Sequence, residues 1–548
     1  MADSDFDNAR GQRPGGNRLA SVISGPRRGA RETWVEIPSR DGEKAAWCYS
    51  DRRAYRPGDT VTLHLSATVE RVSLTIKRDP GGSDAAFTSG IRDAAFHPVP
   101  EQVYAAGCGW PAFLSWTIPD DLASGGYVVE IRDETTAERE VIGHHLFFNR
   151  QKARMPGALV LVAATSTWSA YNDWGGANHY YGINPALPRG RSAQLSALRP
   201  WARGQVALPK GAPRSVNQVR PGKPGPARYD SVEWAFIHGY TRYYALAGWA
   251  SYERPFLQWA EANGYVFDVI TQDELHDDPG VLKDYPCAVF VGHDEYWSRE
   301  MRDAVDAYVD GGGRVARFAG NFLWQIRLDR AAQKQIAWKY DARRLDPEAG
   351  TSCMTSAWED PQIDHPGART FGVNALRGIY AAFGGMARRA ARGFNVFRPE
   401  HWAFAGTGLG YADMFGDEAN IFGFEMDGVE YTFADGLPVP TGEDGAPAGL
   451  SILAMGFATL AESGLPEFES SLMLGDGDAQ FRNSLLGEAS SESLERHKRG
   501  SGMIVHFARG AGEVFTAGTC EWVNGLIEGD CYTQQITRNV LDRFGKRS

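Results

Sequence analysis

The segment from residue 287 to residue 298 constrains the fold of this chain more than any other stretch. An apolar run of strand length, residues 287–292, is followed at once by His293, Asp294 and Glu295, and a predicted helix begins after them. In an open α/β sheet, ligands bind beyond the carboxyl ends of the strands. We therefore expect these three ionisable residues to lie at a binding edge of a sheet, not in a hydrophobic core.

Residues 153–548 repeat patterns of strand and helix. Continuous apolar runs are typical of parallel strands buried on both faces, and segments with a helical period separate them. The pattern predicts an α/β domain with a doubly wound, mostly parallel sheet, as in amidotransferase-like and flavodoxin-like folds. Residues 330–448 are less regular and are predicted to form an insertion that covers the active face. The predicted strands are residues 158–163, 265–270, 287–291, 315–319, 450–454, 503–507 and 514–517.

The N-terminal part of the chain has a different pattern. Residues 33–152 contain short runs of alternating apolar and polar residues, separated by turn residues and without a helical period. This pattern predicts an antiparallel β-sandwich of immunoglobulin-like size. Residues 1–32 are rich in Gly, Arg, Asn and Ser and poor in apolar residues, so a disordered or draped arm is predicted there.

Charge and hydropathy exclude several classes of protein. The formal net charge of −11 argues against a general nucleic-acid binder, which would usually carry a basic face. No apolar run is long enough to predict a membrane span, and the N-terminus lacks the apolar segment of a signal peptide. The six cysteines form no CxxC pair, which predicts a reduced, cytoplasmic setting.

Unusual residues follow three of the predicted strands. Tyr171 lies in an aromatic loop after the first strand, His293 and Glu295 follow the third, and Asn321 follows the fourth. A parallel sheet brings the carboxyl ends of its strands to one edge. We therefore expect these four side chains to converge, although they lie far apart in the sequence.

The predicted site lacks the usual nucleophile of this fold class. Hydrolases with a strand-to-helix elbow place Ser there, and amidotransferase-like folds place Cys, whereas this chain has Asp and Glu. Carboxylate and phenolate are hard ligands, and an unassisted phenol ionises only near pH ~10, so a strongly polarising ion such as Fe³⁺ fits better than Mg²⁺, Ca²⁺ or zinc. Two simpler interpretations stay open. The acidic pair can merely complement a helix dipole, and Tyr171 can merely pack in a core.

At these residues the chain resembles the large (beta) subunit of N,N-dimethylformamidase and its relatives. The resemblance depends most on residues 291–298, with further support from residues 167–176 and 264–276. It covers most of residues 155–545 and continues through residues 301–313, 318–321, 423–428 and 517–522.

This resemblance implies a hydrolase that cleaves the C–N bond of a small N,N-dialkyl amide at a mononuclear ferric site. The ion in that family is held by two tyrosines and one glutamate. On this chain Glu295 matches the glutamate and Tyr171 matches the first tyrosine. His293 and Asn321 match polar residues beside the iron, and Glu425 matches an acidic residue that faces the substrate pocket.

The second tyrosine is less clearly marked in the sequence. Tyr181 is the preferred candidate, because the Tyr-Gly-Ile-Asn element recurs in relatives, and Tyr180 and Tyr229 are the alternatives. The family's large subunit carries an additional lectin-like sandwich and works with a small partner subunit. For this chain we expect a homo-oligomer, or an assembly with such a small subunit.

The sequence therefore predicts a metal-dependent amidohydrolase with a mononuclear Fe³⁺ ion. His293 and Glu425 are expected to move protons, and Asn321 to orient the carbonyl. Two alternatives remain: a thiol hydrolase that uses Cys520, and a non-enzymatic carbohydrate-binding protein whose sandwich contacts the ligand. The sequence identifies neither the amide, nor the leaving amine, nor the oligomeric state.

Overall fold

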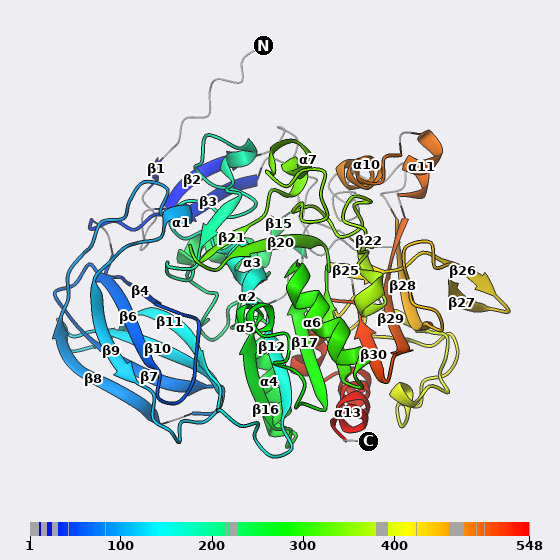
Figure 1. The fold of residues 1–548 in the computed structure, drawn as a ribbon. Helices are drawn as coiled ribbons and strands as arrows, with labels where there is room; N and C mark the ends of the chain where they lie inside the picture. Colours follow the sequence, from blue (N-terminus) through cyan, green and yellow to red (C-terminus); the bar gives the residue numbers. More distant parts are fainter. Residues whose placement is uncertain are drawn as a thin grey trace, which may run out of the picture.

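The computed structural model shows a β-sandwich beside a larger α/β body (Figure 1). It describes residues 10–11, 19–24, 31–41, 43–82, 84–214, 218–219, 228–379, 393–422, 425–459, 476–488, 490–497 and 499–546. In Figure 1 the sandwich, in blue and cyan, lies on the left, and the helices and strands of the α/β body occupy the centre and right.

The sandwich consists of two sheets that share one core. A five-stranded sheet has the order β5-β11-β10-β7-β8, and a three-stranded sheet has the order β4-β6-β9. Alternate residues of β6, Val61, Leu63 and Leu65, meet apolar residues of β7 and β10 in this core. The strands are β4 (Ala46–Ser50), β5 (Ala54–Tyr55), β6 (Thr60–Ala67), β7 (Arg71–Asp79), β8 (Ala85–Asp93), β9 (Ala112–Thr117), β10 (Gly125–Asp133) and β11 (Val141–Asn149). All of them lie within residues 33–152, where the sequence pattern predicts a sandwich.

Part of the predicted N-terminal arm forms strands. β1 (Arg10–Gly11), β2 (Leu19–Ser24) and β3 (Arg31–Glu36) pair in an antiparallel sheet, and Trp34 of β3 donates a hydrogen bond of 2.8 Å to the carbonyl oxygen of Tyr240. Of the two predicted forms, a disordered or a draped arm, these strands do not fit disorder, because backbone hydrogen bonds between strands do not depend on apolar composition. The other residues of the predicted arm lie outside the described residues.

The α/β body is built on a nine-stranded sheet within the described part of the chain. Its order is β16-β12-β17-β19-β30-β29-β28-β23-β24. The neighbours from β16 to β30 pair in parallel, and those from β30 to β24 pair antiparallel. The strands are β12 (Leu159–Ala163), β16 (Phe267–Thr271), β17 (Cys287–His293), β19 (Arg314–Gly320), β23 (Phe394–Val396), β24 (Met414–Phe415), β28 (Ser451–Thr459), β29 (Arg499–Arg509) and β30 (Gly512–Ala517).

The antiparallel half departs from the mostly parallel sheet that the sequence predicts. β29 and β30 are joined by a two-residue turn, with Arg509 paired to Gly512. A parallel pair would need a crossover of a dozen or more residues, so a turn of this length forces an antiparallel pair. The apolar runs alone do not reveal this, because both kinds of strand are buried on both faces here.

Helices cover both faces of the sheet. Leu159 and Leu161 of β12 point into one core, and Val160 and Val162 point into the other. The first core is closed by α4 (Glu253–Ala262), α12 (Trp522–Glu528) and α13 (Cys531–Gly545), and the second by α5 (Gln272–Asp277) and α6 (Arg299–Asp310). Helices of the described chain therefore lie on both faces of the sheet. At the start of α6, Ser298 Oγ accepts the backbone N–H of Met301 and so caps the helix.

Residues 330–448, predicted to be an insertion over the active face, contribute two strands, β23 and β24, to the main sheet. A smaller sheet has the order β13-β21-β20-β18, and its edge strand β18 begins one residue after Glu295. Its strands are β13 (Gln194–Ser196), β18 (Tyr296–Ser298), β20 (Trp324–Asp329) and β21 (Lys334–Ile336). The remaining elements are α1 (Val103–Ala106), α2 (Thr165–Tyr171), η1 (Pro188–Gly190), β14 (Gln218–Val219), β15 (Arg228–Tyr229), α3 (Asp230–His238), η2 (Lys339–Asp341), α7 (Ala342–Leu345), α8 (Ala368–Phe371), β22 (Asn374–Ile379), η3 (Trp402–Phe404), β25 (Met426–Gly428), β26 (Tyr431–Ala434), β27 (Leu437–Pro440), α10 (Asp476–Leu485) and α11 (Ser491–Arg496).

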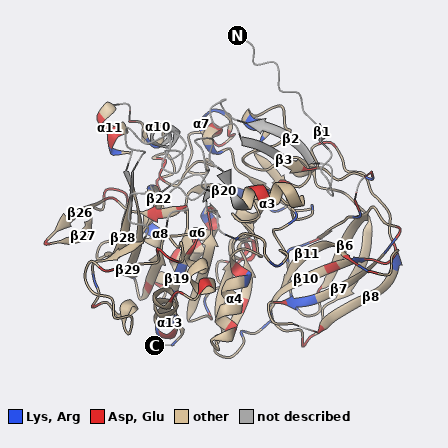
Figure 2. Ribbon diagram, turned by 180° about the vertical axis from the view of Figure 1, so that it is seen from behind, with Lys and Arg blue, Asp and Glu red and all other residues tan. Residues whose placement is uncertain are grey.

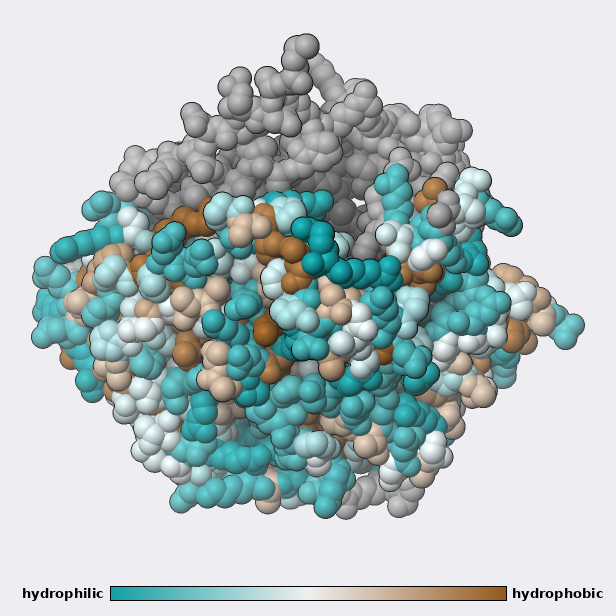
Figure 3. Space-filling view, turned by 45° about the horizontal axis from the view of Figure 1, so that its top comes forward, coloured by the Kyte–Doolittle hydropathy of each residue, from teal (hydrophilic) through white to brown (hydrophobic). Residues whose placement is uncertain are grey.

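The described surface mixes charges and apolar groups. Acidic and basic residues are interspersed along the elements (Figure 2). On the face drawn in Figure 3, hydrophobic residues are scattered in small groups among hydrophilic ones. Of the helices in the described part of the chain, none has the length and apolar character that crossing a bilayer requires.

Candidate active site

The candidate site lies at the carboxyl ends of β12, β17 and β19. β12 leads directly into α2, whose last residue is Tyr171. β17 ends at His293, which is in register with Gly320 at the end of β19. The structure therefore brings Tyr171, His293, Glu295 and Asn321 to one edge of the sheet, as the strand pattern predicts.

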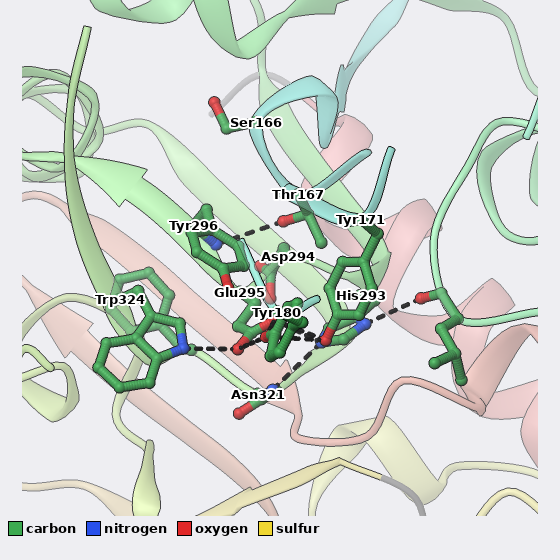
Figure 4. Close-up of polar contacts among 12 residues, drawn as sticks. Ser166, Thr167, Tyr171, Tyr180, His293, Asp294, Glu295, Tyr296, Asn321 and Trp324 are labelled. Carbon is green, nitrogen blue, oxygen red and sulfur yellow. Dashed lines mark hydrogen bonds and ion pairs between the residues drawn. The ribbon is translucent and has the colours of Figure 1, made fainter. Parts of the chain in front are cut away.

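Glu295 is the centre of this cluster. Its carboxylate accepts hydrogen bonds from the phenol of Tyr171 (2.9 Å), from the phenol of Tyr180 (2.6 and 2.7 Å to its two oxygens) and from the indole of Trp324 (2.7 Å). Figure 4 shows these three side chains pointing at the carboxylate from different segments. The Glu295 residue is only 2% exposed. A buried carboxylate with three donors from separate segments is held in one position.

The hydrogen bonds of His293 define its tautomer. Nδ1 lies 2.8 Å from the carbonyl oxygen of Leu246, which can only accept, so Nδ1 carries the proton. Nε2 therefore carries the lone pair, which accepts a hydrogen bond of 3.2 Å from the Asn321 amide nitrogen, and it lies 3.4 Å from the Glu295 carboxylate. Burial lowers the pKa of His293 below its ordinary value, although Glu295 acts in the opposite direction. This shift favours the neutral ring, in which Nε2 can accept a proton.

Asn321 has an unusual backbone and an unused acceptor. Its φ is 63°, in the left-handed region that few residues other than glycine adopt. Its side-chain amide nitrogen faces His293, while its Oδ1 is buried without a hydrogen-bond partner among the described residues. An orphaned acceptor beside a neutral histidine suits a ligand that donates a hydrogen bond, such as water.

The two phenols carry protons in the protein alone. Burial, and after it the charge of Glu295, raises the pKa of both Tyr171 and Tyr180 well above the ordinary value of a phenol. A nearby cation has the opposite effect, since it favours the phenolate. Across the described residues, no group of three or more His, Cys, Asp or Glu side chains is arranged to hold a metal ion. The phenol oxygens of Tyr171 and Tyr180, 3.0 Å apart, are therefore the donors that distinguish this site.

The structure favours Tyr180 over Tyr181 as the second tyrosine. Both backbone N–H groups donate to Asn178 Oδ1, but the two side chains diverge. The Tyr180 phenol contacts Glu295, whereas the ring of Tyr181 lies beside the guanidinium groups of Arg189 and Arg242. The preference for Tyr181 is corrected on this geometry. The side chain of Tyr229, the other alternative, lies outside the described part of the chain.

Lys339 is a neighbour of the site that the sequence reasoning missed. It is buried, its Nζ lies 3.2 Å from the centre of the Tyr180 ring, and it donates a hydrogen bond of 2.7 Å to the phenol of Tyr296. Its φ of 57° is again left-handed. Burial lowers the pKa of Lys339 well below its ordinary value. No motif around position 339 could have identified Lys339 from the sequence. Trp324, which also contacts Glu295, could have been found, because it lies three residues after Asn321.

Glu425 approaches the site through a close backbone contact. A Cβ atom at Gly320 would lie 2.1 Å from the carbonyl oxygen of Glu425, so glycine is required there. The φ of Glu425 is 46°. After burial and Glu295, the charge of Glu425 is the next cause of the raised pKa of Tyr171. The predicted acidic neighbour is therefore within electrostatic reach of the phenols.

Cys520 is poorly suited to be a nucleophile. Its side chain is fully buried at the end of β30. Burial, and then the charges of Glu425 and Glu521, raises the pKa of the Cys520 thiol well above its ordinary value. A nucleophilic cysteine needs a lowered pKa, so this geometry argues against the thiol-hydrolase alternative.

Replacing Cys520 with alanine is accordingly expected to leave turnover within about threefold of the wild type, while the lost packing costs about 1 kcal/mol of stability. Steady-state kinetics and urea unfolding measure the two effects. Iodoacetamide treatment of the wild-type protein should also leave turnover unchanged. Loss of turnover in Cys520→Ala with an intact fold would contradict this expectation.

Glu253 holds the backbone at the start of α2, the helix that ends at Tyr171. Its carboxyl oxygen accepts the backbone N–H of Ala164 at 3.0 Å, immediately before the helix that carries Tyr171. Burial raises the pKa of Glu253 from 4.5 to about 8. As pH rises, the Glu253 carboxyl loses its proton in the unfolded chain before it does so in the folded protein. The free energy of unfolding therefore falls between pH of about 4.5 and about 8.

The variant Glu253→Gln keeps an acceptor for Ala164 without the charge. It is expected to match the wild type near pH 4.5 and to be more stable by about 2–4 kcal/mol near pH 8. Urea unfolding of both proteins across this range gives the difference. A difference that does not change with pH would show that Glu253 does not ionise in this way.

A family model described as "N,N-dimethylformamidase beta subunit-like, C-terminal" matches residues 79–534. The chain belongs to this family. The match includes every residue of the cluster around Glu295 and most of the sandwich.

The chain is also similar to a curated protein named N,N-dimethylformamidase beta subunit from Alcaligenes sp.. The two are 24% identical over 457 residues, which is 80% of this chain and 55% of that protein. The chain therefore spans about half the length of this relative.

Proposed function

We propose that this chain is an amidohydrolase that cleaves the C–N bond of a small N,N-dialkyl amide. The observation that carries the proposal is a buried cluster at the carboxyl edge of the sheet. In this cluster two phenols and one carboxylate, those of Tyr171, Tyr180 and Glu295, form hydrogen bonds with one another. Membership of the family and the similarity to an N,N-dimethylformamidase beta subunit support the choice of substrate class. The reaction consumes one water and releases a carboxylic acid and a secondary amine.

The donor set fits a hard, highly charged cation, and Fe³⁺ is the ion we propose. Tyr171, Tyr180 and Glu295 would hold it, since their oxygens already lie within 3.0 Å of one another. When bound, such an ion supplies Lewis acidity toward the amide carbonyl and toward water. Because burial and Glu295 raise the pKa of both phenols, only a strongly polarising cation would bind them as phenolates.

The polar residues beside this donor set are arranged for proton transfer. The lone pair of His293 Nε2 faces the site and is suited to take a proton from the attacking water. The orphaned Oδ1 of Asn321 is suited to accept a hydrogen bond from the same water and so to orient it. The proton held by His293 then passes to the nitrogen of the departing amine, assisted by the nearby carboxyl group of Glu425.

The relative is named as a subunit, which supports an oligomeric state for this chain. We propose that it works as a homo-oligomer or with a small partner subunit, in a reduced, cytoplasmic setting. Light scattering after size-exclusion chromatography of the purified chain tests whether it forms a homo-oligomer.

An assay with N,N-dimethylformamide tests the proposed function. Purified protein is expected to release equal amounts of formate and dimethylamine, each measured separately, and His293→Gln is expected to lower kcat by about 100-fold or more. Asn263→Ala, at the exposed C-terminal end of α4, serves as the surface control, because the side-chain contacts described for Asn263 go to Trp259 and Arg538 and not to the cluster. Wild-type protein that hydrolyses none of a series of N-methyl and N,N-dialkyl amides would contradict the proposal.

A further inference from the structure

Arg317 lies between two buried aspartates directly behind the site. Its guanidinium is 2.5 and 2.7 Å from the two carboxyl oxygens of Asp294 and 2.9 Å from Asp427 Oδ2. All three side chains are almost fully buried. Water therefore does not screen these ion pairs, and Arg317 is the partner of both carboxylates.

Asp294, Arg317 and Asp427 form a triad, and each of them belongs to a segment that carries a site residue. Asp294 stands between His293 and Glu295 in the chain, and Figure 4 shows it among the site residues. Arg317 is on β19, which ends just before Asn321. Asp427 lies two residues after Glu425, in β25.

A second contact strengthens the link between two of these segments. The carboxylate of Asp427 accepts the backbone N–H of Phe322, the residue after Asn321, at 3.1 and 3.3 Å. The rings of Phe322 and Phe371 lie 5.5 and 5.0 Å from the guanidinium carbon of Arg317. The arginine is thus held by aromatic faces as well as by its two ion pairs.

The triad also flanks the two strained backbone positions of the site. Asn321 and Glu425 both have left-handed φ values, 63° and 46°. Such conformations cost free energy in residues other than glycine and persist only where the surrounding structure holds them. The Asp427 contacts to Phe322 and Arg317 hold the chain immediately after both positions.

We propose that Arg317 is the positioning residue of the site. By pairing with Asp294 and Asp427 it holds the His293–Glu295, Asn321 and Glu425 segments in one relative arrangement. This inference rests on the proposed function for its kinetic test, but the geometry of His293 provides a test that does not need activity.

The test compares Arg317→Met with Arg302→Met. Arg302 is a matched control, because it is equally buried and donates to the carbonyl oxygens of His365 and Pro366, and it stacks on Trp358 at 4.2 Å. Its hydrogen bonds go to the 365–370 segment, and it shares with Arg317 a contact with the ring of Phe322, at 5.2 Å, but it makes no ion pair with Asp294 or Asp427 among the described residues. Both variants lose a buried arginine, so a general loss of stability affects both.

Two readouts are measured for each variant. The first is kcat for amide hydrolysis, corrected for the folded fraction. The second is the Nδ1–H resonance of His293 in protein labelled with ¹⁵N-histidine, assigned by its absence in His293→Gln. In Arg317→Met, kcat is expected to fall by about 100-fold and the resonance to shift or disappear, whereas Arg302→Met keeps both.

The inference is overturned if folded Arg317→Met keeps the wild-type resonance. If the wild type hydrolyses no amide, the proposed function fails, and the resonance alone then decides whether Arg317 positions the site. Should Arg317→Met fail to fold, the triple variant Arg317→Met, Asp294→Asn, Asp427→Asn removes the uncompensated charges and restores stability. A positioning role predicts that kcat and the resonance stay impaired in that stable triple variant, and their full recovery would refute it.

Discussion

Replacing Glu295 with glutamine is expected to lower kcat for amide hydrolysis by at least about 1,000-fold. Glu295 is the single acceptor shared by the phenols of Tyr171 and Tyr180 and by the indole of Trp324. A glutamine side chain has one acceptor oxygen and turns its own NH₂ group toward these donors. It therefore loses both the negative charge and the arrangement of the two phenols.

The matched control is Glu521→Gln. Glu521 is also a buried glutamate that accepts a hydrogen bond from a tyrosine, the phenol of Tyr252 at 2.9 Å. It makes no contact with the phenols of Tyr171 and Tyr180 in the described structure. Steady-state kinetics of both variants, with circular dichroism to check the fold, decide the matter. Equal activity of Glu295→Gln and wild type would remove Glu295 from the centre of the site.

The variants Tyr180→Phe and Tyr181→Phe are expected to differ sharply although the residues are adjacent. Removing the Tyr180 hydroxyl takes away the contact of 2.6 Å to Glu295, and kcat is expected to fall by about 100-fold or more. The ring of Tyr181 lies beside arginine side chains, so its variant should keep kcat within about threefold.

Each variant is the control for the other, because both remove one hydroxyl from the same loop. Thermal unfolding measured beside the kinetics shows whether either change acts through stability. Loss of activity in Tyr181→Phe with full activity in Tyr180→Phe would reverse the assignment of the second tyrosine.

Much of the site could be predicted because its residues follow strands. The apolar runs at residues 158–163 and 287–291 correspond to β12 and β17, and strand ends in a parallel sheet meet at one edge. Tyr171, His293 and Asn321 follow from that rule alone. The rule fails for the C-terminal half of the sheet, where the two-residue turn between β29 and β30 determines strand direction.

The other site residues depend on loop geometry that the sequence does not encode in a simple pattern. The orientation of Tyr180 follows from two backbone hydrogen bonds to Asn178, which no periodicity predicts. Lys339 reaches the Tyr180 ring from a segment more than a hundred and fifty residues away and with a left-handed backbone. Such contacts depend on how the insertion packs over the sheet.

Metal analysis of active protein, together with its visible spectrum, tests the central claim most directly. Iron–phenolate sites absorb visible light, so the account predicts coloured protein that contains iron. Both the iron and the colour should be lost in Glu295→Gln and in Tyr180→Phe and kept in Tyr181→Phe. Active protein that is colourless and contains zinc, or no metal, would contradict the claim that Tyr171, Tyr180 and Glu295 hold a ferric ion.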